Sequence, residues 1–239
     1  NPKETNKKSN ALAQTIDLGP TILDYFDIPL TEDMQGKAIF DFIEDDKEIR
    51  KASLYGVMGG QVNVTDGQYV YMRATTTEDN KPLYDYTLMP THMKNRFSPR
   101  ELQEWEKVEG FSFMKGCKVM QIPTRTFPIF SAKDNPLGRG RTATLLFDVE
   151  NDPGQTKPLN DVNIEQRMIK LMIREMARNE CPSEQYIRLG LPEPKRLGKG
   201  HGNEMIQMPS DKEISDSCVL DKAQGIEAAE HGAEGFPKM

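Results

Sequence analysis

Cysteine, long apolar runs and excess basic charge are all scarce in this chain of 239 residues. Three cysteines are an odd number, so a disulfide framework is not expected and a reducing compartment is favoured. No apolar run approaches the roughly 20 residues of a membrane-spanning helix, so no membrane partner is expected. The formal net charge of -6 argues against a nucleic-acid partner, because nucleic-acid surfaces need clustered lysine and arginine.

The start of the chain leaves its localisation open. The sequence opens on Asn1 with neither an initiator methionine nor a signal peptide, so we expect the native N-terminus to lie further upstream. The localisation is unknown from the sequence, and the cysteine count favours the cytoplasm.

Residues 11–29 hold the most informative local pattern. The run 11–16 is short and apolar and predicts the end of a strand, while Asp17 can accept hydrogen bonds from the N–H groups of the next turn. Pro20 then suits the first turn of a helix. Four apolar residues at helical spacing predict one buried helix face: Leu18, Ile22, Leu23 and Phe26. A strand followed by a helix is the repeating unit of layered α/β domains.

Two runs in this chain form distinctive motifs. Residues 14–29 read Gln-Thr-Ile-Asp-Leu-Gly-Pro-Thr-Ile-Leu-Asp-Tyr-Phe-Asp-Ile-Pro, and residues 33–37 read Asp-Met-Gln-Gly-Lys. They resemble the segment that closes the catalytic domain in the sulfatase family, part of the alkaline phosphatase superfamily. Residues 146–156, Leu-Phe-Asp-Val-Glu-Asn-Asp-Pro-Gly-Gln-Thr, are similar to a second, downstream signature of that family. Together the motifs bracket roughly residues 10–180.

The resemblance implies a parent enzyme that cleaves sulfate esters of a small molecule or carbohydrate. Sulfatases use a formylglycine nucleophile, made from a Cys-x-Pro-x-Arg or Ser-x-Pro-x-Arg motif, and a divalent metal, usually calcium, held by oxygen ligands. In the family this machinery lies upstream of the helix that matches residues 18–26. This chain is therefore expected to be a C-terminal portion that binds no cofactor, is inactive alone and has the missing N-terminal catalytic domain as its partner.

Two alternatives remain open at this point. The same superfamily scaffold also serves phosphodiester and phosphonate monoester hydrolases. A non-catalytic binding or structural module is the competing class. Cys181-Pro182-Ser183 has its proline one place too early for the nucleophile motif and no arginine in register, so we expect neither a catalytic residue nor a metal ligand in this chain.

The elements predicted downstream define an α+β fold. We expect a small antiparallel sheet of about four strands with packed helices, preceded by the last strand-helix unit of an α/β sulfatase domain. The predicted division is residues 1–45 for the catalytic-domain remnant and 46–180 for the antiparallel-sheet subdomain. Residues 181–239 are rich in glycine, proline and charge and predict a polar tail with little apolar surface to bury.

A hairpin is the clearest strand signal. Two alternating runs flank Asp66-Gly67, a pair typical of type I′ turns, which predicts Val64 opposite Tyr69. Residues 54–58 are predicted to form a neighbouring strand, and residues 143–149 are predicted to form a further strand. Asn63 begins an Asn-x-Thr glycosylation sequon, although a polar position on a strand is the simpler interpretation.

Two helices are predicted beyond the hairpin. Ser98, Pro99 and Glu101 form a helix-start pattern, and Trp105 one turn later is expected to anchor that helix in the core. Residues 111–130, which contain two prolines, predict irregular chain rather than a central strand. A second helix is expected to be capped by Asn163 and to bury a stripe formed by Ile164, Met168, Leu171, Met172 and Met176.

His92 and Lys94 are the candidate substrate-binding residues. The imidazole lies beside Lys94 and Arg96 in sequence, a combination that can bind a sulfate or phosphate ester through charge-assisted hydrogen bonds. An ordinary surface histidine with solvated neighbours is the alternative. The glycine- and arginine-containing run 137–141 predicts a turn rather than a phosphate loop. The acidic run 148–152 predicts a structural turn rather than a metal loop.

Overall fold

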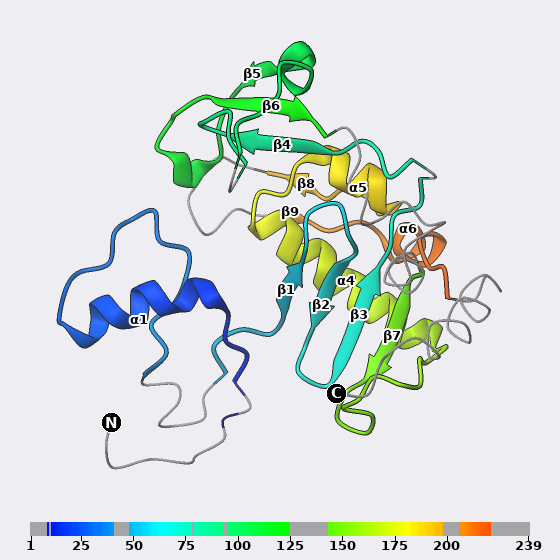
Figure 1. Ribbon diagram of the computed structural model, residues 1–239. Helices are drawn as coiled ribbons and strands as arrows, with labels where there is room; N and C mark the ends of the chain where they lie inside the picture. The colour runs from blue at the N-terminus through cyan, green and yellow to red at the C-terminus, as the bar shows by residue number, and fades with distance from the viewer. Residues whose placement is uncertain are drawn as a thin grey trace.

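The computed structural model describes residues 9, 11–40, 48–77, 79–92, 95–124, 143–197 and 206–220. Helices and antiparallel strands occur together, so the predicted α+β class is confirmed (Figure 1). The helical elements are η1 Thr15–Asp17, α1 Leu18–Tyr25, η2 Glu101–Glu104, η3 Ser112–Met114, α4 Val162–Arg178, α5 Ser183–Leu189 and α6 Asp211–Asp216. The strands are β1 Ser53–Gly56, β2 Val62–Thr65, β3 Tyr69–Arg73, β4 Tyr84–Thr87, β5 Glu106–Val108, β6 Val119–Pro123, β7 Leu145–Asp148, β8 Lys195–Arg196 and β9 Ile206–Gln207.

The main core lies between a four-stranded sheet and α4. The sheet has the order β1-β2-β3-β7 with every pair antiparallel, and α4 crosses one of its faces (Figure 1). Val64 and Tyr71 of the sheet and Met168 and Met172 of the helix are completely buried in one cluster. The predicted strands near residues 54–58 and 143–149 correspond to β1 and β7.

The hairpin between β2 and β3 turns one residue later than predicted. Val64 is opposite Tyr71, and Asp66 N–H donates to the Tyr69 carbonyl. Gly67 has a φ of 98°, which suits the first central position of a type II′ turn. The Asp66 carboxylate also accepts a hydrogen bond from Tyr69 N–H at 2.7 Å, which favours this turn. The predicted Val64–Tyr69 pairing is wrong by two residues, a shift that leaves the same side chains on the same face.

The second sheet, with the order β4-β6-β5, replaces two predicted elements. Residues 98–108 form only the single turn η2 before β5 pairs with β6, so the predicted longer helix is wrong. Trp105 is 44% exposed and does not anchor the core. Residues 119–123, predicted to be irregular, form the central strand β6; Pro123 is tolerated because it stands at the strand end, opposite Tyr84. Within the run 111–130, residues 125–130 lie outside the described residues.

The first helix is present, but its surroundings differ from the prediction. Residues 11–14 form no strand, since none of the described strands pairs with them. Leu18 and Ile22 are each 57% exposed and Phe26 is 64% exposed, so the expected buried face is wrong. Within the described residues, α1 is set apart from the sheets (Figure 1). The buried residues of α1 are instead Pro20 and Thr21.

Helix α4 carries the predicted methionine stripe with a different cap. Its N-cap is Asp161, whose carboxylate accepts hydrogen bonds from the N–H groups of Asn163 and Ile164. The predicted Asn163 cap is therefore wrong by two residues. The buried stripe also contains an acid, because Glu165 is completely buried beside Met168.

Residues beyond 181 contribute to the main core. Tyr186 and Leu189 of α5 and Ile214 of α6 are each at most 2% exposed and belong to the same cluster as Met172. The expectation of a tail that buries little apolar surface is thus wrong for the described residues up to 220. In the described part of the chain, no helix has the length and apolar character needed to cross a membrane.

Candidate functional site

His92 lies in a short loop against the second sheet. Thr91 and Arg96 bridge the two sides of this loop, and the His92 ring lies 4.0 Å, between centroids, from the buried Phe97 ring. His92 Nε2 lies 2.8 Å from Glu101 Oε1. The direct partner of the imidazole in the structure is therefore a carboxylate. Lys94 and residues 137–141 lie outside the described residues, so the sulfate-binding hypothesis stays a prediction.

Glu101 is held by three contacts that favour its charged form. The Ser98 hydroxyl and Ser98 N–H each donate to Glu101 Oε2 at 2.7 Å, and His92 contacts Oε1. The Ser98 contacts, followed by His92, lower the pKa of Glu101 to about 2 from its ordinary value of 4.5. A carboxyl group with a lowered folded-state pKa stabilises the fold above its unfolded pKa, and that contribution is lost as the pH falls through the folded value.

An NMR titration of the Glu101 side-chain carboxyl checks this assignment. We expect a midpoint near pH 2, and in Ser98→Ala a midpoint closer to 4.5, because the first of the three contacts is gone. A wild-type midpoint near 4.5 would show that these hydrogen bonds do not persist in solution.

Two other sequence candidates have structural explanations. Burial, reinforced by the Glu184 charge, raises the pKa of the Cys181 thiol to about 12, so this cysteine is not activated as a nucleophile. In the turn after β7, Asp148 accepts hydrogen bonds from the N–H groups of Glu150 and Asn151. The Asp152 carboxylate accepts hydrogen bonds from the N–H groups of Thr156 and Lys157. These carboxylates stabilise the turn, as predicted.

Asp17 is the centre of a buried polar cluster near the start of the chain. The Arg50 guanidinium contacts both Asp17 carboxylate oxygens at 2.6 Å, and the N–H groups of Gln14 and Lys37 donate to the same carboxylate at 2.8 and 2.9 Å. Burial opposes ionisation of Asp17, but the hydrogen bonds from Arg50 and the two N–H groups outweigh it and lower the pKa of Asp17. Asp17 therefore joins three chain segments instead of capping α1 as predicted.

The cluster is tied to the edge of the main sheet. Arg50 also donates to the Leu12 carbonyl at 3.0 Å, and the Gln14 side chain donates to the Leu54 carbonyl of β1 at 2.8 Å. The Lys37 ammonium donates to the Ile49 carbonyl. These contacts fix the segment that carries α1 relative to β1.

Gly36 allows the segments 14–17 and 34–37 to approach each other. A Cβ atom at this position would lie 2.0 Å from the Ile16 carbonyl oxygen. Gly36→Ala must therefore push Lys37 N–H away from Asp17, and we expect it to destabilise this region by about 1–3 kcal/mol. Thermal unfolding measures the effect. Gly19→Ala, at an open helical position with nothing within 4 Å, is the control and is expected to stabilise the chain instead. Equal changes in the thermal unfolding of Gly36→Ala and Gly19→Ala would contradict the close approach of Gly36 to Ile16.

A groove of about 1260 Å³ lies beside this cluster. Its walls come from residues 14–37, from the η3 turn and from the C-terminal half of α4. Acidic and basic side chains alternate in it: Lys115 contacts Asp33 at 3.3 Å, and Arg178 contacts Glu175 at 3.3 Å. The charged side chains that line the groove can form hydrogen bonds and ion pairs with a polar ligand. In the described part of the chain, no three His, Cys, Asp or Glu side chains are arranged to hold a metal ion.

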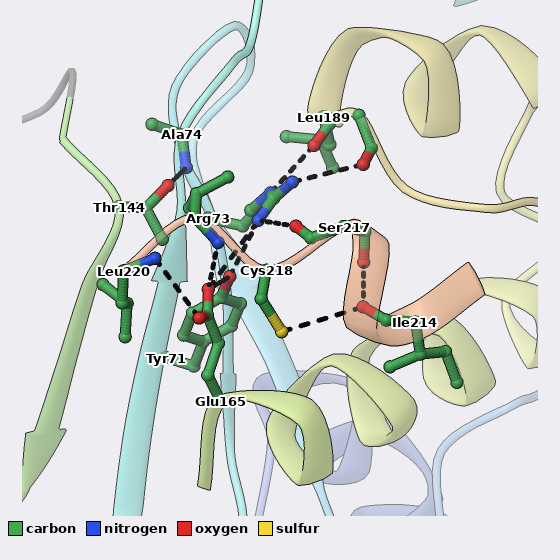
Figure 2. Close-up of polar contacts among 12 residues, drawn as sticks. Tyr71, Arg73, Ala74, Thr144, Glu165, Leu189, Ile214, Ser217, Cys218 and Leu220 are labelled. Atoms are coloured by element: carbon green, nitrogen blue, oxygen red, sulfur yellow. Dashed lines mark hydrogen bonds and ion pairs between the residues drawn. The ribbon is translucent and has the colours of Figure 1, made fainter. Parts of the chain in front are cut away.

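A second polar cluster is buried inside the main core (Figure 2). Arg73 is 1% exposed, and its guanidinium donates to the Tyr71 hydroxyl and to the carbonyls of Leu189, Gly190 and Ser217. Glu165 lies 3.9 Å from Arg73 and accepts a hydrogen bond from Tyr71 at 2.9 Å. The surrounding burial raises the pKa of Tyr71 well above its ordinary value.

These buried charges could have been recognised from their positions in the sequence. Glu165 precedes Met168 and Met172 by three and seven residues, so it falls on the apolar face of α4, where an acid requires a buried partner. Arg73 lies two residues after Tyr71 and so on the same face of β3. Arg188 is another buried cation: it is 2% exposed, and its guanidinium donates hydrogen bonds to the Gly60 carbonyl and the Asn80 side-chain oxygen.

Comparisons with known proteins connect the first half of the chain to an enzyme family. Residues 1–109 match the family model described as N-sulphoglucosamine sulphohydrolase, C-terminal. No curated protein matches the chain. The match contains the motifs at 14–29 and 33–37, which supply Gln14, Asp17 and Lys37 of the Asp17 cluster, whereas the run at 146–156 lies beyond it. The predicted resemblance to sulfatases is thereby confirmed over residues 1–109, which are similar to the C-terminal domain of N-sulphoglucosamine sulphohydrolase, a sulfatase.

Proposed function

We propose that this chain forms the C-terminal part of a sulfatase-like hydrolase and supports a catalytic domain encoded upstream of it. In this proposal the upstream domain supplies the formylglycine nucleophile and the divalent metal, usually calcium. This chain supplies the antiparallel-sheet subdomain and part of the rim of the substrate pocket. The family match over residues 1–109 is the observation that carries the proposal.

The exposed side of α1 supports an upstream partner. Leu18, Ile22 and Phe26 are more than half exposed, and the adjoining Tyr25 is 67% exposed. Contiguous apolar surface of this kind is typical of interaction sites. The Asp17 cluster ties the segment that precedes α1 to Arg50 and, through the Gln14 side chain, to the Leu54 carbonyl of β1, so the position of the helix is held at its N-terminal end. A catalytic α/β domain, for which this helix would be the last element, is the partner that we propose.

The substrate class in this proposal is a sulfated small molecule or carbohydrate. The family description names an enzyme that acts on N-sulphoglucosamine, so an N-linked sulfate on a sugar is a candidate beside sulfate esters. His92 and Lys94 are proposed for the rim. To bind a sulfate, His92 must either exchange Glu101 for the ligand at Nε2 or use Nδ1.

Activity assays on two forms of the protein test the proposal. The protein purified from its source and the isolated 239-residue chain are each given an aryl sulfate, glucosamine N-sulfate and an aryl phosphate diester. We expect the native protein to release sulfate in a metal-dependent reaction, and the isolated chain to show only the uncatalysed rate. Preferential cleavage of the phosphate diester would favour the phosphodiesterase alternative. No hydrolysis by the native protein would favour a non-catalytic module, and sulfate release by the isolated chain would contradict the proposal.

A further inference from the structure

Residues 208–220, which follow β9 in the last described segment, are packed against the body of the protein and are named here the strap. It contains α6, which begins with a Ser210–Glu213 capping box. Three of its side chains enter the main core: Ile214 is 1% exposed, and Cys218 and Leu220 are each 7% exposed. The strap therefore covers apolar surface of α4 that would otherwise face solvent.

One carboxylate of the body holds the end of the strap (Figure 2). Glu165 Oε1 accepts a hydrogen bond from Val219 N–H at 3.1 Å, and Oε2 accepts one from Leu220 N–H at 3.2 Å. Arg73, from β3, donates to the Ser217 carbonyl at 2.9 Å. Glu165 acts only as an acceptor in these contacts, and a glutamine in its place would keep only one of the two acceptor oxygens.

The other polar contacts of the strap are exposed. Lys170 contacts Asp211 at 2.7 Å, and Gln166 donates to Ser215 at 3.2 Å. Exposed pairs of this kind contribute little to stability. The sheet beneath is held by its own ladder of paired strands, to which the strap adds no strand. Within the described residues, the buried contacts of the strap are those with Glu165 and Arg73 and the packing of its three buried side chains.

We propose that the strap is a separately opening unit that the Glu165 carboxylate locks onto the body. Opening would break the contacts of Val219 and Leu220 with Glu165, withdraw Ile214 from α4 and expose Cys218, while the four-stranded sheet stays paired. Proteins open in contiguous cooperative units, and a unit can open at a lower free energy than global unfolding. This inference does not depend on the proposed enzymatic function.

The three cysteines allow this opening to be measured in the intact chain. Cys117 is exposed, Cys181 is partly buried beside α5, and Cys218 is buried in the strap. A thiol reagent is added to the native protein, and peptide mass spectrometry follows the labelling of each cysteine with time. In Glu165→Gln we expect the labelling of Cys218 to accelerate at least about tenfold more than that of Cys181, with the exposed Cys117 unchanged, because Glu165 also pairs with Arg73 of the body and its loss weakens the whole domain to a smaller extent. Glu175→Gln is the matched control, since Glu175 lies on the same helix and, within the described part of the chain, its side chain pairs with Arg178 and not with the strap.

A second variant keeps the test decisive if Glu165→Gln does not fold. Ile214→Ala leaves Glu165 in place and removes an anchor on the strap itself. We expect it, too, to accelerate labelling of Cys218 more than that of Cys181. Equal acceleration at Cys181 and Cys218 in the folded variants would show that the strap opens only with the whole domain, which would overturn the proposal. Unchanged labelling of Cys218 in both variants would overturn it too.

Discussion

Arg73→Met is expected to lower the free energy of unfolding by about 3–5 kcal/mol, because it removes one partner of a buried charge pair. Glu165 would remain completely buried without its cation, and the carbonyls of Leu189 and Ser217 would lose their donor. Methionine fills a similar volume, so the loss reports chiefly the polar contacts. Urea unfolding, followed by far-UV circular dichroism, gives the free energy from the midpoint and slope.

Arg178→Met is the control for this substitution. Arg178 is exposed on α4, and the partner of its guanidinium among the described residues is Glu175 three residues earlier, so we expect a change below about 0.5 kcal/mol. Arg73→Lys separates charge from geometry: it keeps the cation but cannot reach the acceptors on three different segments, so we expect an intermediate loss. A loss for Arg73→Met no larger than for Arg178→Met would contradict the role assigned to the buried cluster.

Asp17→Asn is expected to release the segment that carries α1 without unfolding the main sheet. Asparagine keeps one acceptor oxygen but leaves the Arg50 guanidinium, which is 10% exposed, without its carboxylate. Breaking a buried pair in this way costs about 3–5 kcal/mol. Hydrogen exchange should show loss of protection at Lys37 N–H and across α1, while β2 and β3 keep theirs.

The pH dependence of the same exchange gives an independent check. Because the folded-state pKa of Asp17 lies below its ordinary value of 3.8, the pair stabilises the protein above that pH. This contribution should disappear as the pH falls through the folded-state value. Asp24→Asn, on the exposed side of α1, is the control and should change neither exchange nor its pH dependence. Unchanged protection of Lys37 N–H in Asp17→Asn would show that the pair does not hold this segment.

The sequence predicts the parts of this fold that repeat a simple period. Alternation of apolar and polar residues predicted β2 and β3, and helical spacing of apolar residues predicted the buried methionines of α4. Both patterns arise because one face of the element is buried. The single turn η2 shows the limit of local signals: Ser98 and Glu101 make the predicted capping contacts, yet pairing of β5 with β6 takes the chain away from the helix.

The candidate sites depended more on tertiary contacts than on local pattern. Asp17 was predicted from its position to cap a helix, but it binds Arg50, which is 33 residues away in sequence. Arg73 and Glu165 are separated by more than 90 residues, so only a search for charges on apolar faces could have paired them. Helical spacing shows that one face of α1 is apolar, but it does not show whether another part of the protein covers that face. The predicted burial of this face was therefore wrong.

The intact mass of the native protein tests the central proposal most directly. The protein would be captured from its source with an antibody raised against this chain and measured by mass spectrometry. The proposal predicts a mass of roughly twice the 27.1 kDa of this sequence, given ordinary domain sizes, with peptides that map upstream of Asn1. A native mass close to 27.1 kDa would contradict the proposal and favour a separate binding or structural protein.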